Sequence, residues 1–282
     1  MKIIIGTVQF GLNYGVNNQN GIPDDKELEE IFDLAKKSSI DLLDTAPAYG
    51  NAQLRIGELS QNQFNIVTKF PRINSFTELA DSFNNSLKAL DSEKIYGFIA
   101  HDADNLIDNP KYWNFLLALK QDEKVQKIGY SLYNPHQLNQ LLEIGLKPDL
   151  IQIPYNILNR SFEEYFEILK GMGTEIHVRS VFLQGLFFMN PDRLPKKLES
   201  LSNVLRELNH ISQKLKTDIA TLALNFVAQN PKIDAVVLGV ESTEQLQKNL
   251  SMLQSSLNFV SVTNEIKLIR VQEEELLNPA NW

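Results

Sequence analysis

Two patterns alternate along the whole sequence: short runs rich in Ile, Val and Leu, and longer stretches with helical periodicity. Parallel strands joined by crossover helices produce this alternation, because each crossover must return the chain to the same end of the sheet. The apolar runs are short enough to be strands rather than helices. We predict eight strands, near Ile3–Thr7, Leu42–Asp44, Ile66–Lys69, Tyr96–Ala100, Lys127–Tyr130, Leu150–Ile153, Glu175–Arg179 and Ala235–Leu238.

Amphipathic stretches lie between the predicted strands. In the first of them, Leu28, Ile31 and Leu34 repeat every three residues along one face, and charged residues cover the rest. Helices of this kind pack one face against a sheet and expose the other to water. The predicted helices are Asp25–Ser38, Phe76–Leu90, Tyr112–Lys120, Pro135–Leu142, Phe162–Leu169 and Thr243–Leu250.

The series of strand and helix units predicts an α/β fold, and its length of 282 residues suits a (β/α)8 TIM barrel. A doubly wound sheet is less favoured, because no G-x-G-x-x-G follows an early strand. At least two extra helices are expected in Pro191–Asn230, and the insertion at 187–230 could act as a lid. A helical tail is expected in Val260–Trp282, with its helix at 264–277. No linker or repeat divides the sequence, so residues 1–282 are predicted to form a single domain.

Charge and composition restrict the partners. The formal net charge of −8 disfavours nucleic acid, because the usual excess of Lys and Arg is missing. The sequence has no cysteine, which excludes disulfides and zinc-thiolate sites. It begins with a predicted strand rather than a signal peptide, and no apolar stretch is long enough to span a membrane. We expect a cytoplasmic protein, a monomer or small homo-oligomer, that binds a small molecule and neither nucleic acid nor membrane.

Four chemically capable side chains are expected at one rim of the barrel. Active sites of such barrels form at the C-terminal ends of the strands. Asp44 closes the second predicted strand, and Lys69 closes the third. Tyr49 lies in the turn after the second strand, and His101 directly follows the fourth. The order of the strands predicts that these side chains meet.

Together the four side chains can give a proton to a carbonyl oxygen. An ammonium beside a phenol favours the phenolate, so Lys69 is expected to lower the pKa of Tyr49. Asp44 would pair with Lys69 in the low-dielectric pocket, and His101 would hydrogen-bond the carbonyl. Each residue alone also suits a structural role. Asp44 and Lys69 could form a structural ion pair, Tyr49 could be a packing or capping residue, and the His101 imidazole could hydrogen-bond the backbone. Their joint occurrence at successive strand ends favours catalysis.

The same segments resemble the aldo-keto reductase family. The start IIIGTVQFGLNYG is similar to its first-strand signature, and DLLDTAPAYGNAQLRIGE is similar to its motif of an Asp, a Tyr-Gly and a Gly-Glu. NIVTKF resembles the lysine strand, FIAHD the histidine strand, and the similarity extends to VVLGVESTEQLQKNL. The resemblance implies a reductase that passes hydride from NADPH or NADH to an aldehyde or ketone, without a metal, through the catalytic residues Asp44, Tyr49, Lys69 and His101.

The resemblance also implies where the nicotinamide half of the cofactor binds. Ser131 and Gln152 would hydrogen-bond the carboxamide, although Ser131 could instead cap the next helix and Gln152 could satisfy barrel backbone. Leu132 stands where relatives often carry Asn, which removes one carboxamide contact. The residues implied for this half are Gly6, Thr7, Val8, Asp44, Ser131 and Gln152.

The other half of the cofactor would lie along the seventh and eighth strands. Arg179 stands where relatives often place an aromatic residue, and it could stack on the nicotinamide or contact a phosphate. Ser242 is also an ordinary N-cap residue. Relatives often bind the 2′-phosphate of NADP with Lys or Arg, whereas here Gly239, Val240 and Gln245 fill those places and Glu241 is acidic. Only Lys248 and Arg179 could supply a positive charge, so we expect a weaker preference for NADP. The implied residues are Arg179, Ser180, Gln184, Gly239, Val240, Glu241, Ser242, Gln245 and Asn249.

The sequence also leaves three functions other than reduction open. A sensor on the same barrel would bind cofactor without turnover, and a lyase or isomerase would use Lys69 as a Schiff base. A metal-dependent hydrolase fits less well, because the four histidines show no metal-binding spacing. The RSVFLQGL segment is similar to bacterial members linked to sugar metabolism, which suggests a keto-sugar or hydroxyaldehyde, with aromatic aldehydes equally admissible.

Overall fold

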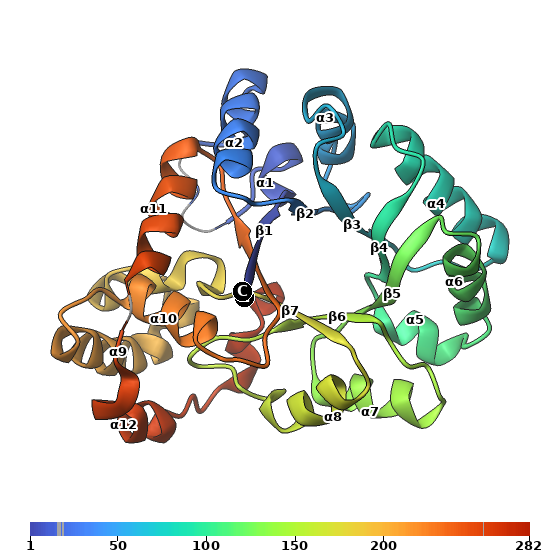
Figure 1. The fold of residues 1–282 in the computed structure, drawn as a ribbon. Coiled ribbons are helices and arrows are strands. Elements are labelled where there is room, and N and C mark those ends of the chain that lie inside the picture. The colour runs from blue at the N-terminus through green and yellow to red at the C-terminus, as the bar shows by residue number, and fades with distance from the viewer. Residues whose placement is uncertain (16–17, 19, 256) are drawn as a thin grey trace.

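The computed structural model describes residues 1–15, 18, 20–255 and 257–282. Within these ranges, eight parallel strands close into a barrel whose order follows the chain (Figure 1). The barrel closes where Gly6 pairs with Asp44 on one side and with Gly239 on the other. The predicted TIM barrel is confirmed. The strands are β1 (Lys2–Gly6), β2 (Leu42–Asp44), β3 (Asn65–Phe70), β4 (Ile95–Ala100), β5 (Val125–Ser131), β6 (Leu150–Pro154), β7 (Glu175–Arg179) and β8 (Ala235–Gly239).

Helices surround the barrel, as Figure 1 shows. The stretch predicted as a helix over Phe162–Leu169 is a 3-10 turn, η1 (Glu163–Tyr165), followed by the helix α8 (Phe166–Gly171). The other predicted helices are present with small shifts of their ends. They are α2 (Asp25–Lys37), α4 (Phe76–Ala89), α6 (Tyr112–Gln121), α7 (Pro135–Glu143) and α11 (Thr243–Gln254).

Some short helices were not predicted, and α3 shows why. Its inner face buries Gln53 and Arg55 rather than apolar side chains alone. Gln53 Nε2 donates to the Thr68 hydroxyl over 2.7 Å, and Arg55 Nη1 donates to the Phe10 carbonyl over 2.7 Å. These partners satisfy the buried polar groups. Because polar residues occupy part of the buried face, the apolar periodicity that predicts a helix is missing from the sequence. The unpredicted helices are α1 (Val8–Gly11), α3 (Ala52–Leu59) and α5 (Ala103–Asp108).

The expected extra helices follow β7. The helices α9 (Ser202–Lys214) and α10 (Ile219–Ala228) lie between β7 and β8, which confirms that prediction. Short 3-10 segments precede them. They are η2 (Leu183–Phe188), η3 (Pro191–Arg193) and η4 (Lys196–Leu201).

The C-terminal tail is helical but broken. The predicted helical tail is confirmed, but its helix at 264–277 is interrupted, because α12 (Thr263–Leu268) ends before Ile269, whose ψ of 128° is not helical. Arg160, in the loop after β6, donates to the carbonyls of Ile266 and Ile269 over 3.3 Å each and so satisfies the helix end. The tail therefore packs against the loops at the C-terminal ends of the strands. Its remaining segments are η5 (Phe259–Ser261), η6 (Glu274–Leu277) and η7 (Pro279–Asn281).

Three apolar clusters hold this arrangement. One fills the inside of the barrel, a second lies between the strands and the outer helices, and a third joins α9, α10 and the tail to the loops after β6 and β7. Successive strand residues point to opposite faces, so one set of side chains fills the barrel and the other packs against the helices. The inner cluster contains Ile4, Leu42, Val67, Ile99, Leu150 and Ala235.

Across the described ranges, none of the helices is both long and apolar enough to cross a membrane. In the same part of the chain, His, Asp and Glu side chains form no group of three or more that could hold a metal ion.

Candidate active site

Asp44 and Lys69 form a buried ion pair where β2 and β3 end. Lys69 Nζ lies 2.7 Å from each carboxylate oxygen of Asp44, and it also donates to the Thr45 carbonyl over 3.0 Å. The two side chains are 1% and 4% exposed. Burial opposes the charged ammonium, but the Asp44 carboxylate and Tyr49 together raise the pKa of Lys69. Lys69 therefore stays protonated, and Gln152 holds Asp44 by a further 2.7 Å hydrogen bond from Nε2.

The Tyr49 phenol lies beside this ion pair. Lys69 Nζ donates to its hydroxyl over 3.4 Å and lies 5.2 Å from the centre of its ring. Burial raises the pKa of Tyr49 by more than the Lys69 charge lowers it. The net lowering predicted from the sequence is therefore wrong, because burial strips the phenolate of its hydration. The phenol keeps its proton at neutral pH and has it available to give.

His101 completes the group as a neutral imidazole. Its ring meets the Tyr49 ring edge to face, with centroids 6.0 Å apart and an interplanar angle of 89°. Burial, followed by the charge of Lys69, lowers the pKa of His101 to about 4. A neutral imidazole offers one N–H donor, so His101 can orient a carbonyl oxygen without adding a charge.

A cavity of about 540 Å³ opens at this rim, a size typical of small-molecule sites. Asp44, Tyr49 and His101 line it, whereas Lys69 lies behind Asp44. Most residues predicted to hold a cofactor line it as well. They are Gly6, Thr7, Val8, Asp44, Ser131, Gln152, Arg179, Ser180, Gln184, Gly239, Glu241, Gln245 and Asn249.

Two predicted contact residues lie off the cavity wall. Val240 is fully buried in the apolar cluster between strands and helices. Ser242 begins α11, and its hydroxyl accepts from the Gln245 backbone N–H over 3.2 Å. The N-cap role considered for Ser242 is therefore the one it fills here.

Comparison with known proteins agrees with this arrangement of strand-end residues in a closed barrel. The profile of the Aldo/keto reductase family matches residues 2–277. The chain belongs to this family. The family is one of oxidoreductases, as predicted.

Individual relatives are distant. The chain is 26% identical over 216 residues to the L-glyceraldehyde 3-phosphate reductase of Escherichia coli (strain K12), which covers 68% of this chain and 62% of that relative. It is 24% identical over 266 residues to the aldo-keto reductase YhdN of Bacillus subtilis (strain 168), covering 80% and 78%. The holo form of the aldo-keto reductase AKR11C1 from Bacillus halodurans superposes with a TM-score of 0.76 at 19% identity, covering 96% of this chain and 94% of that one. At this identity, the superposition shows a shared fold.

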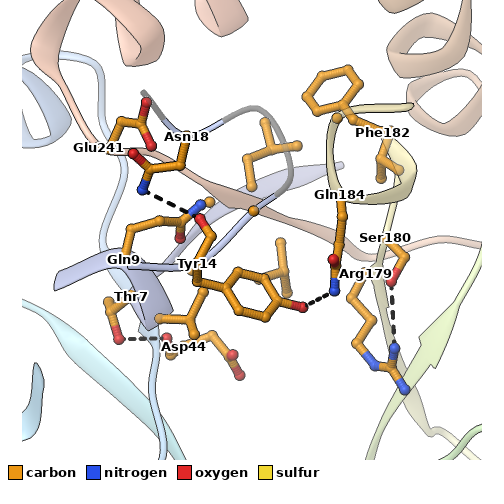
Figure 2. A pocket seen from close by; sticks show the side chains of 18 of the residues that line it. Thr7, Gln9, Tyr14, Asn18, Asp44, Arg179, Ser180, Phe182, Gln184 and Glu241 are labelled. Carbon is orange, nitrogen blue, oxygen red and sulfur yellow. Dashed lines mark hydrogen bonds between the residues drawn. The ribbon is translucent and has the colours of Figure 1, made fainter. Parts of the chain in front are cut away.

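The segment after β7 has an unusual backbone. Ser180, Leu183 and Gln184 have φ values of 61°, 45° and 51°, a region that non-glycine residues seldom adopt. The Gln184 amide donates to the Tyr14 hydroxyl, and Figure 2 shows this contact joining the loop after α1 to the segment after β7 across the cavity. Positive φ values often cluster where a ligand binds, so this wall suits a binding role.

Sequence reasoning missed Gln9 as a cavity residue. Gln9 lines the cavity, and its buried Oε1 has no hydrogen-bond partner within the described residues. Its amide lies against Gly239, where an added Cβ would approach Nε2 to 2.6 Å. Only a glycine leaves room for the amide there. The available signal was a polar side chain two positions after Thr7, in the first-strand signature.

The end of the cavity beside α11 is acidic. The Glu241 side chain accepts from Gln245 Nε2 over 2.8 Å, and burial raises its pKa. The first N–H of α11, at Thr243, donates to Glu27 over 2.5 Å. The carboxylate of Glu27 therefore occupies a position that an anion could otherwise take at this helix start. Lys248 also lines this end, with Nζ 5.7 Å from the centre of the Phe188 ring.

Proposed function

We propose that this chain reduces an aldehyde or ketone to the alcohol, with NADH or NADPH as electron donor and Tyr49 as proton donor. The observation that carries the proposal is the continuous contact from Asp44 through Lys69 to the Tyr49 hydroxyl, at the wall of the cavity. Membership of the family supports the same reaction.

Each member of the group has a distinct task. Tyr49 gives its proton to the carbonyl oxygen of the substrate as negative charge develops there. Lys69 stabilises the phenolate that remains, because its ammonium lies 3.4 Å from that oxygen. Asp44 holds Lys69 in place and balances its charge in the buried site. His101 donates a hydrogen bond to the same substrate oxygen and fixes its direction.

A nicotinamide cofactor fits the donor and acceptor groups around the cavity. Gln152 donates to Asp44 through Nε2, which leaves its Oε1 for a carboxamide N–H. Ser131 lies beside Gln152 in the strand register and lines the same cavity. Gln9 Oε1 is a buried acceptor in need of a donor, such as a ribose hydroxyl. A reduced nicotinamide bound there supplies the hydride.

We also propose that NADH serves at least as well as NADPH. A buried acidic side chain, Glu241, lines the end of the cavity, and Glu27 occupies the start of α11. Both carboxylates repel a 2′-phosphate, whereas Glu241 can accept hydrogen bonds from ribose hydroxyls. Competitive titration of the two cofactors tests this, and Glu241→Gln should shift the ratio of dissociation constants towards NADPH. A strong NADPH preference in the unaltered protein contradicts the proposal.

A small hydroxyaldehyde or keto-sugar is the proposed substrate. The Escherichia coli relative is an L-glyceraldehyde 3-phosphate reductase, which supports a small aldehyde with neighbouring hydroxyl groups.

The loss of reduced-nicotinamide absorbance over a panel of aldehydes and ketones tests the reaction. We expect turnover with at least one hydroxyaldehyde and a matching yield of the alcohol. Tight cofactor binding without turnover on the whole panel would instead identify a non-catalytic cofactor sensor on the same barrel.

A further inference from the structure

The Arg179 side chain extends from the end of β7, past β6, to the end of β5. It closes β7, where it pairs with Pro154 of β6, and β6 in turn pairs with β5. Its Nη2 nevertheless donates to the carbonyl of Leu132, directly after β5, over 3.0 Å. The guanidinium carbon lies 4.6 Å from the centre of the Tyr133 ring. The side chain is therefore turned towards the end of β5.

The surroundings of Arg179 leave its charge uncompensated. Of the described residues, none places a carboxylate within 4.0 Å of it, whereas Arg55 has Asp25 at 2.6 Å. Its recorded acceptors are neutral, the Leu132 carbonyl and the Ser180 hydroxyl at 3.4 Å. A guanidinium carries five N–H donors, so these bonds leave donors free for a ligand at the cavity.

The other cationic groups near Tyr49 cannot fill the same role. The charge of Lys69 is balanced by Asp44 at 2.7 Å. His101 is neutral, because burial and then Lys69 lower its pKa to about 4, and Arg179 adds to that lowering. Arg179 lines the same cavity as Tyr49 and His101, so its free donors face the space that a carbonyl substrate would occupy.

We propose that Arg179 binds an anionic group, a carboxylate or a phosphate, carried by the carbonyl substrate. The preferred substrates are then short aldehydes or ketones that bear such a group a few bonds from the carbonyl. A planar guanidinium binds both anions through paired N–H donors, and an anion balances the partly buried charge. This inference rests on the proposed function and adds a substrate class to it. It adds a third role to the two considered for Arg179 from the sequence, stacking on the nicotinamide and contact with a cofactor phosphate.

Matched substrate pairs test the inference. Glyceraldehyde 3-phosphate is compared with glyceraldehyde, and succinic semialdehyde with butyraldehyde, in the unaltered protein, Arg179→Met and Arg179→Lys. We expect the unaltered protein to favour the anionic members, and Arg179→Met to lower kcat/KM for them by about 10- to 100-fold, as for a lost hydrogen bond to a charged group. The loss of kcat/KM on neutral substrates should be much smaller than the loss on the anionic ones. Arg179→Lys should fall between the two, and Arg206→Met, an exposed arginine on α9, should change nothing.

A binding measurement complements the kinetics. Succinate and inorganic phosphate should each raise the Tm of the unaltered protein more than that of Arg179→Met, and the larger effect identifies the preferred anion. An equal loss on neutral and anionic substrates, together with weaker cofactor binding, overturns the inference and assigns Arg179 to the cofactor. Equal kcat/KM for both members of each pair in the unaltered protein also overturns it. Absence of turnover on all four substrates, with the same Tm shifts in both proteins, overturns the inference, and absence of turnover across the wider panel overturns the proposed function.

Discussion

The two walls of the cavity differ in how completely their polar groups are satisfied. At the ends of β2 and β3, Lys69 and Asp44 are buried and bonded to each other, and Gln152 adds a further bond. Around the rest of the cavity lining, here called the ligand wall, Gln9 Oε1 has no partner among the described residues, and Arg179 has only neutral acceptors. Polar groups that already have fixed partners are preorganised for catalysis. Donors and acceptors without partners remain available to bind ligands.

The largest effect is expected at the ends of β2 and β3, here called the satisfied wall because Lys69 and Asp44 are bonded to each other there. Lys69→Met should lower kcat by roughly 10²- to 10⁴-fold, because the Tyr49 phenolate loses its cation. It should also lower the free energy of unfolding by about 3–5 kcal/mol, because Asp44 becomes a buried charge without its partner. Steady-state kinetics and chemical denaturation measure the two effects.

The double variant Asp44→Asn, Lys69→Met separates these effects. Removing both charges should restore much of the lost stability and none of the activity. If Lys69→Met stayed active, or if the double variant were as unstable as Lys69→Met, the pair would not serve both catalysis and stability.

A smaller effect is expected on the ligand wall. Gly239→Ala should weaken cofactor binding by about tenfold, because the added Cβ displaces the Gln9 amide or enters the cavity. Gly171→Ala is the matched control, since nothing lies within 4 Å of a Cβ there. Calorimetric titration with NADH measures both. Unchanged affinity in Gly239→Ala would mean that the Gln9 and Gly239 contact does not shape the cofactor site.

The smallest effect concerns His101 and pH. The unfolded chain protonates this imidazole near pH 6.5, whereas the folded protein does so only near pH 4. Between these values the unfolded state binds more protons, so the free energy of unfolding should fall as the pH falls. His101→Gln should remove part of this slope, and His136→Gln, at an exposed position, should not. Identical slopes in His101→Gln and the unaltered protein would contradict the neutral imidazole.

The satisfied wall was largely predictable from the sequence, and the ligand wall was not. Asp44, Lys69 and His101 lie at strand ends, and the parallel order of a barrel brings strand ends together. The direction of Arg179 could not be read in this way, because its long side chain crosses β6 to bond Leu132. The balance between burial and charge at Tyr49 also depends on packing that strand positions do not reveal.

The sequence carried a usable signal for Val240 but none for helix α3. Val240 was predicted to contact the cofactor together with its neighbours, yet it is buried while Gly239 and Glu241 line the cavity. The two-residue alternation of an extended strand end predicts this difference. Helix α3 was missed because Gln53 and Arg55 lie on its buried face, and a search for apolar periodicity alone does not detect such a helix.

The central claim is that the Tyr49 hydroxyl delivers the proton from a site completed by Lys69 and Asp44. The most direct test compares Tyr49→Phe with the unaltered protein, in kcat with an accepted aldehyde and in the dissociation constant for the reduced cofactor. The account predicts that kcat falls by roughly 10²- to 10⁴-fold while cofactor affinity stays unchanged. Turnover at the unaltered rate in Tyr49→Phe would contradict it.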